Sequence, residues 1–241
     1  MARPDSPVDP VPSAQRSPDR SARRSAICAA ALELAAAGGN RAVTHHAIDD
    51  RLGIARGSTS YYYRTRLELL RASVIHLATT SRQAFRVAAD AQDSGAPTVR
   101  TAADLMAGQL DLLLGPRRSD ALARYALAAD AAGDEALREA LANCLFSVPA
   151  ATALFEALGA AESNRAVSGT NQPVSGANQP VAELDPERAA RDLISLLEGL
   201  LFDRLYGARS LLGLAAGTPA SLADLRAPVL RWLTVLGNGI R

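Results

Sequence analysis

The chain has 241 residues, 26 basic and 25 acidic side chains and a net charge of +1, and this length suits one compact domain or two small ones. Alanine fills 50 positions, lysine fills none and aromatic residues make up 4%, so the composition favours helices over strands and predicts an all-α fold. No apolar run approaches the roughly 20 residues that cross a bilayer. The proline-containing start of the chain also lacks the apolar stretch of a signal peptide. We therefore expect a cytoplasmic protein with no membrane association.

The charged residues are distributed unevenly along the chain. Residues 1–71 hold eleven arginines and seven acidic residues, whereas residues 72–241 hold fifteen arginines and eighteen acidic residues. The positive N-terminal part is the natural place for contact with a polyanion, and chance variation in composition is the alternative explanation. Cys28, Cys144 and three histidines show no metal-ligand spacing and no disulfide framework, so we expect no metal and no cofactor.

The predicted elements form a series of helices along the chain. Residues 1–16 are proline-rich without hydrophobic periodicity, and we expect them to be disordered. Thr65 and Glu68 have the spacing of a capping box at the start of a long helix. Hydrophobic periodicity and capping residues predict helices at 17–37, 44–52, 55–62, 65–91, 98–114, 119–132, 134–158, 185–206 and 218–236.

Two breaks are expected in the C-terminal part of this series. Pro149 should kink or break the helix at 134–158, because proline lacks the amide hydrogen that a helix interior needs. Residues 159–184 include a seven-residue tandem repeat at 167–180 that is rich in Gly, Asn, Gln and Pro. This composition predicts a flexible loop at 159–184.

Residues 44–63, THHAIDDRLGIARGSTSYYY, have the pattern of a helix-turn-helix motif. The small side chains at 57–60 would keep the second helix slim enough for a major groove about 12 Å wide. Arg56 could reach a guanine edge or a phosphate, and Tyr61 and Tyr62 could donate hydrogen bonds to the DNA backbone. The motif predicts binding to double-stranded DNA.

Residues 27–70 resemble the DNA-binding domain of the TetR (tetracycline-repressor-like) transcriptional regulators. The match runs without a gap through AALEL at 30–34, AVT at 42–44, Gly57–Ser58 and the helix start at Thr65. The chain departs from the family pattern at Asp49, where a small alanine is usual and the two helices of the motif meet. Asp49 either accepts a hydrogen bond from the second helix of the motif or marks a rotation of the first.

The resemblance implies a helix-turn-helix DNA-binding domain at 17–65 and a helical ligand-binding and dimerisation domain at 66–241. It further implies that Thr44, Tyr62 and Arg66 bind phosphates, while the start of the second helix faces the major groove. His45 is either a contact at the groove edge or an exposed residue at a helix start. The residues expected to bind DNA are Thr44, His45, Arg56, Gly57, Ser58, Thr59, Ser60, Tyr61, Tyr62 and Arg66.

The family plan also implies a ligand cavity among the middle helices, which here carry few charges and favour an apolar small-molecule effector. The candidate lining residues, each of which ordinary core packing would also explain, are Met106, Leu110, Leu113, Tyr125, Phe146, Phe155 and Phe202.

The helix at 185–206 has apolar residues on more than one face, which predicts a partner chain; a buried central helix in a monomer is the alternative. The family plan likewise places a homodimer interface on the last two helices. The residues expected there are Leu193, Leu197, Leu200, Leu201, Leu225, Val229, Trp232 and Leu236.

These features predict a sequence-specific DNA-binding transcriptional regulator, acting as a dimeric repressor that a ligand releases from its operator. A ligand-independent DNA-binding regulator or an architectural protein is the alternative. We do not expect an enzyme, because the sequence has no glycine-rich phosphate loop after a strand, no G-x-S-x-G motif and no Cys–His constellation.

Overall fold

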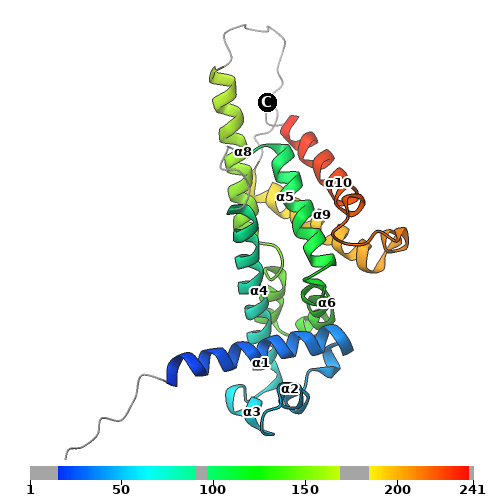
Figure 1. Cartoon of the computed structure of the whole chain (residues 1–241). Coiled ribbons are helices and arrows are strands. Elements are labelled where there is room, and N and C mark those ends of the chain that lie inside the picture. The colour runs from blue at the N-terminus through cyan, green and yellow to red at the C-terminus, as the bar shows by residue number, and fades with distance from the viewer. Residues whose placement is uncertain (1–15, 91–96, 169–184, 239–241) are drawn as a thin grey trace, which may run out of the picture.

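The computed structural model describes residues 16–90, 97–168 and 185–238, and these ranges fold into helices without strands (Figure 1). The predicted all-α fold is confirmed. The elements are α1 (Arg16–Gly38), η1 (Asn40–Ala42), α2 (His45–Leu52), α3 (Ser58–Tyr62), α4 (Arg66–Asp90), α5 (Val99–Leu114), α6 (Arg118–Leu127), η2 (Ala128–Gly133), α7 (Glu135–Ala142), α8 (Val148–Ser168), α9 (Pro186–Tyr206), η3 (Ala208–Leu212) and α10 (Pro219–Asn238), where η marks a 3₁₀ helix.

The helix starts follow from capping side chains in the sequence. Thr65 Oγ1 accepts the backbone N–H of Glu68 at 3.1 Å, and Glu68 Oε2 accepts the backbone N–H of Thr65 at 3.2 Å. This reciprocal pair is the predicted capping box, and it satisfies amides that have no partner inside α4. Thr98 and Thr101 form a capping box at the start of α5, and Asp185 caps α9 by accepting the backbone N–H of Glu187.

The helix predicted at 134–158 is two helices in the structure. α7 ends at Ala142 and α8 begins at Val148, so Pro149 lies in the first turn of α8, where its missing N–H costs no hydrogen bond. Residues 159–168 continue α8 rather than forming a loop, because this stretch is rich in alanine and contains no proline. Most of the tandem repeat, from residue 169 on, and the arm at 1–15 lie outside the described residues.

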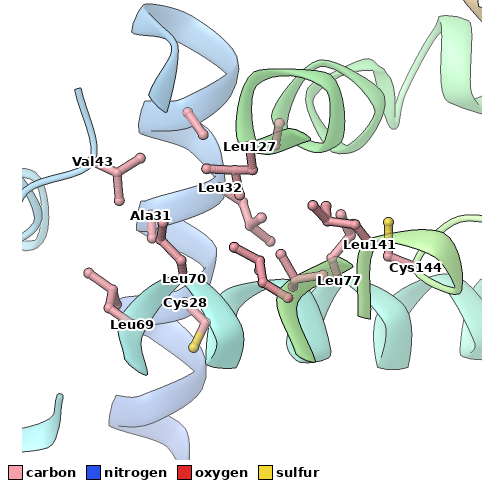
Figure 2. Packing of buried hydrophobic residues seen from close by; sticks show 14 of the residues in the cluster. Cys28, Ala31, Leu32, Val43, Leu69, Leu70, Leu77, Leu127, Leu141 and Cys144 are labelled. Atoms are coloured by element: carbon pink, nitrogen blue, oxygen red, sulfur yellow. The ribbon is translucent and has the colours of Figure 1, made fainter. Parts of the chain in front are cut away.

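Two hydrophobic cores organise the described helices. In the first core, α1 crosses α4, and Leu32, Leu70, Leu77 and Leu127 meet between α1, α4 and α6 (Figure 2). The second core joins α5, α8, α9 and α10, which lie beside and beyond the C-terminal half of α4 (Figure 1). The motif at 44–63 therefore shares a core with α6 and α7, which belong to the larger helical part of the chain.

Candidate nucleic-acid interface and effector cavity

Two glycines shape the turn between α2 and α3. Gly53 ends α2 at φ +61°, and Gly57 precedes α3 at φ +90°. Both values lie in the left-handed region, which glycine adopts without the steric cost of a side chain. The start of α2 is capped by Thr44, whose hydroxyl accepts the backbone N–H of Ala47 at 3.1 Å. The helix-turn-helix geometry therefore follows from three local residues, Thr44, Gly53 and Gly57.

Asp49 fixes the start of α3 from inside the motif. Its Oδ1 accepts the backbone N–H of Thr59 at 2.8 Å and the Thr59 hydroxyl at 2.6 Å, and its Oδ2 accepts the backbone N–H of Gly57 at 2.7 Å. The side chain is fully buried. Burial alone would raise the pKa of Asp49, but these hydrogen bonds outweigh it and the pKa lies below its usual value. Of the two interpretations of Asp49, the hydrogen bond from α3 is confirmed.

Thr59 is consequently not available to DNA, although the family resemblance placed it in the major groove. Its side chain is fully buried because its hydroxyl and amide are both bound to Asp49. Its role in this chain is to hold α3 in place.

Tyr63 fixes the other end of α3. Its ring is 5% exposed, its hydroxyl lies 3.3 Å from Cys28 Sγ, and the guanidinium of Arg24 lies 5.0 Å from the ring centroid. Burial, helped by the contact with Cys28, raises the pKa of the Tyr63 hydroxyl, which stays neutral. The ring nitrogen Nε2 of His45 lies 2.8 Å from the Tyr63 carbonyl oxygen, to which its N–H donates. His45 therefore ties α2 to the end of α3, which neither sequence interpretation of this residue included.

The predicted contact residues that remain exposed lie on the outer face of α3, in the turn before it and at the start of α2. The Tyr61 side chain is 72% exposed, and that of Arg56 is 73% exposed with Nε 3.8 Å from Asp50 Oδ1. Gly57 and Ser60 are exposed beside them, whereas Ser58 and Tyr62 are half-buried. Thr44 is also exposed at the start of α2.

Two arginines extend this exposed face beyond the residues expected to bind DNA. The guanidinium of Arg20 on α1 lies 6.0 Å from the Tyr61 ring centroid. Arg64 is exposed directly after α3. The signal for Arg64 in the sequence was its position, because it is an arginine directly after the second helix of the motif.

A cavity of about 770 Å³ lies between α4, α5, α8, α9 and the segment 143–147. Its volume falls within the range of small-molecule sites, and most of its lining is apolar. Three of the predicted residues, Met106, Leu113 and Phe146, line it together with Phe85 and Leu154. Cys144 is also one of the lining residues. Burial raises the pKa of its thiol to about 12, so the thiol stays protonated.

The charged side chains of the cavity wall are all arginines. Arg82, Arg86 and Arg117 contribute to the lining, and no Asp or Glu does so among the described residues. Arg117 is neutralised by Asp120 at 2.8 Å and donates to Ser81 Oγ at 2.7 Å.

Solved structures of TetR-family regulators are similar to this chain. A TetR transcription regulator from Haloarcula marismortui superposes with a TM-score of 0.62 at 15% sequence identity, over 89% of this chain and 98% of that chain. A TetR-family member from Streptomyces coelicolor A3 gives a TM-score of 0.58 at 19% identity, over 87% and 97% of the two chains. The multidrug binding protein EbrR complexed with ethidium gives 0.53 at 20% identity, over 87% and 98%. No protein-family model matches the sequence, and no curated protein matches it significantly.

The chain has the TetR-family fold. In this fold α2 and α3 form the helix-turn-helix, and α4 runs away from that motif (Figure 1). The C-terminal half of α4, from Ser81 to Ala89, contributes to the wall of the cavity. Within the described ranges, no helix is long and apolar enough to span a bilayer, and no cluster of His, Cys, Asp and Glu could hold a metal ion.

Arg66 connects the helix-turn-helix to η2 in this TetR-family fold, although it was expected to bind a DNA phosphate. Its guanidinium donates to Asp130 Oδ1 at 2.7 Å and to the Asn40 carbonyl at 2.8 Å. One turn further along α4, Arg71 contacts Asp134 at 2.5 Å. The hydrogen bond from Arg66 lowers the pKa of Asp130, which stays ionised. The acidic partners lie more than sixty residues away in sequence, so no local pattern pointed to them.

Replacing Arg66 by alanine is therefore expected to act through Asp130. Because the pair is partly exposed, we expect a loss of about 1 kcal/mol of unfolding free energy, and a coupling of similar size in a double-mutant cycle with Asp130→Ala. Urea denaturation of the four proteins measures both quantities. A phosphate contact would instead make Arg66→Ala weaken DNA binding while Asp130→Ala leaves it unchanged.

The remaining predicted residues of the cavity lie elsewhere in the TetR-family fold. Leu110 and Phe155 belong to the second core, where they are in contact with neighbouring helices. Tyr125 and Phe202 pack against each other with ring centroids 5.6 Å apart, and Tyr206 completes this aromatic cluster on α6 and α9. Apolar character alone did not distinguish the wall of the cavity from the core and this cluster.

Most of the residues expected at a dimer interface are buried within the chain itself. Leu193, Leu197, Leu200, Leu201, Leu225 and Val229 form part of the second core, because α5, α8 and α10 cover these faces. Trp232 and Leu236 are half-buried against the same core. The apolar side chains that α9, η3 and α10 do expose, here called the outer apolar residues, are Phe202, Tyr206, Leu211, Leu212, Leu222 and Val235.

Proposed function

We propose that this chain is a TetR-family transcriptional regulator that binds a DNA operator as a homodimer. The observation that carries the proposal is one exposed surface, formed by Arg56 in the turn before α3 and Tyr61 on α3, while Asp49 and Tyr63 hold the helix from behind. A rigid helix with slim leading residues and an exposed guanidinium has the chemistry that reads a major groove. The similarity to TetR-family structures supports the same function.

The experiment that tests DNA binding is fluorescence anisotropy on DNA from immediately upstream of the gene, against a scrambled duplex, in a salt series. We expect a preference of roughly 10³-fold or more and an affinity that falls steeply with salt, because neutralised phosphates release counterions. Equal and weak binding to both duplexes across overlapping upstream fragments would contradict the proposal.

Replacing Arg56 by alanine is expected to weaken operator binding by about 1–3 kcal/mol and to relax specificity at one base pair. The reason is that an exposed guanidinium can form a bidentate contact to a guanine edge. Anisotropy on a set of single-base operator variants measures the effect. Arg51→Ala is a matched control, because Arg51 is bound to Glu33 on α1 at 2.7 Å. A uniform loss on cognate and scrambled DNA would assign Arg56 to a phosphate instead.

We further propose that a small molecule in the cavity releases the operator. α4 begins next to the helix-turn-helix at Arg66 and lines the cavity from Ser81 to Ala89, so a ligand that shifts this helix would move α3. EbrR, which has the same fold, is described in complex with ethidium. A ligand that stabilises this protein thermally but leaves operator affinity unchanged would contradict the release mechanism.

The homodimer, in this proposal, forms through the outer apolar residues of α9, η3 and α10. The argument is that α9, η3 and α10 each expose large apolar side chains in a single chain, and a partner chain would cover them. A dimer would bring two α3 helices to successive major grooves, as a two-fold symmetric operator requires.

A further inference from the structure

The charge of the cavity wall points to the class of its ligand. Arg82 and Arg86 are one turn apart on α4, so both lie on the same side of the helix as Phe85 and Ala89, which also line the cavity. Neither arginine has an ion-pair or hydrogen-bond partner among the described residues. Since Asp120 neutralises Arg117, the uncompensated charge of the wall comes from Arg82 and Arg86.

Gln109 adds a polar group inside the otherwise apolar part of the cavity. Its side chain is 8% exposed and lines the wall beside Met106 and Leu113, and it has no hydrogen-bond partner within the described part of the chain. An amide on an otherwise apolar wall favours a ligand that offers it a hydrogen bond. The cavity thus combines an apolar interior, one free amide and two free guanidinium groups.

We infer that the cavity binds an amphipathic organic anion, in which an apolar body fills the space between α5, α8 and α9 and a carboxylate meets Arg82 and Arg86. Hydrogen bonds between a guanidinium and a carboxylate are short and charge-assisted, and they exceed neutral hydrogen bonds in strength. A cation of the same shape would face two positive charges and no acidic side chain of the wall. That this anion also acts as the effector rests on the proposed function.

The test compares three ligands that share an apolar chain and differ in the charge of the end group. Isothermal titration calorimetry of the full chain measures the affinities of decanoate, decan-1-ol and decyltrimethylammonium, with octyl and dodecyl homologues in each series. We expect decanoate to bind about tenfold or more tightly than decan-1-ol, and the cation to bind most weakly. Added salt should weaken the binding of decanoate alone, because only its contact is ionic.

The double variant Arg82→Gln/Arg86→Gln locates this preference. Both side chains are exposed, so the variant should fold normally, and its melting temperature without ligand checks this. We expect its affinity for decanoate to fall about tenfold to that of decan-1-ol, whose own affinity stays unchanged. Arg100→Gln is the matched control, because Arg100 is an exposed arginine on α5 outside the cavity wall.

Several results would overturn the inference. They are equal affinities for the three end groups, tighter binding of the cation, no binding in any series, and a decanoate affinity that the double variant leaves unchanged.

Operator binding measured by anisotropy with the same ligands separates this inference from the proposed function. If decanoate binds through the arginines but does not release DNA, ligand release fails and the ligand class stands. If decan-1-ol or the cation binds best and releases DNA, the ligand class fails and ligand release stands.

Discussion

Replacing Asp49 by alanine is expected to lower the free energy of unfolding by about 3–5 kcal/mol and to abolish specific operator binding. The carboxylate accepts three hydrogen bonds in a fully buried site. Removing it leaves the amide and the hydroxyl of Thr59 without partners, and each such buried donor costs about 1–3 kcal/mol. The part-buried amide of Gly57 loses its partner as well. α3 has only five residues, so it has little helical stability of its own to resist this loss. Urea denaturation monitored by circular dichroism, together with anisotropy on the operator, measures both effects.

Two milder variants separate the charge of Asp49 from its shape. Asp49→Asn keeps the volume but turns an N–H group toward a backbone amide, so we expect an intermediate loss of stability. Thr59→Val removes the hydroxyl alone and should cost about 1 kcal/mol. Unchanged stability and DNA affinity in Asp49→Ala would show that these hydrogen bonds do not hold α3.

The stability that Asp49 contributes should also depend on pH in a defined direction. Its pKa is lower in the folded chain than in the unfolded chain, so its contribution is present above the ordinary pKa of about 4 and is lost as the pH falls through the folded value. The difference in unfolding free energy between the wild type and Asp49→Asn should therefore shrink below about pH 4. A difference that stays constant down to the acid limit would contradict the assignment of the charge to Asp49.

Local signals in the sequence were sufficient for the helices and for the position of the motif. Thr44, Thr65 and Gly53 act within a few residues of the element that they start or end, so their effect can be predicted without the fold. The predicted end of the helix before the tandem repeat was too early, because helix-forming alanines carry α8 to Ser168.

The roles that depend on distant partners could not be predicted in this way. Arg66 has a phosphate-binding position in the family resemblance, but its partner Asp130 comes from η2, 64 residues later. Thr59 has the spacing of a groove residue, but the unusual Asp49 binds it. In both cases an acidic side chain binds a group that would otherwise face solvent or DNA.

The two adjacent residues Leu201 and Phe202 should have opposite effects on stability and association. Leu201 is fully buried in the second core, whereas Phe202 is 51% exposed. Leu201→Ala is expected to cost about 2–5 kcal/mol of unfolding free energy, because it removes buried methyl groups and leaves a cavity. Phe202→Glu should cost far less stability in the monomer, but it should weaken dimerisation by about 2 kcal/mol or more, as loss of an aromatic anchor does at interfaces.

Sedimentation velocity over a concentration series measures the dimer, and urea denaturation at two protein concentrations separates folding from association, since a dimer gains stability with concentration. Leu201→Ala should remain dimeric where it is folded. A second variant, Leu211→Glu, changes the most exposed of the outer apolar residues at 87% and should likewise weaken the dimer without lowering the stability of the monomer. If Leu201→Ala is stable but monomeric, Leu201 contacts the partner chain, because a residue that only fills the core cannot control association. The dimer interface would then lie where the sequence pattern predicted it. A dimer that tolerates both glutamates would place the interface on another surface of the chain.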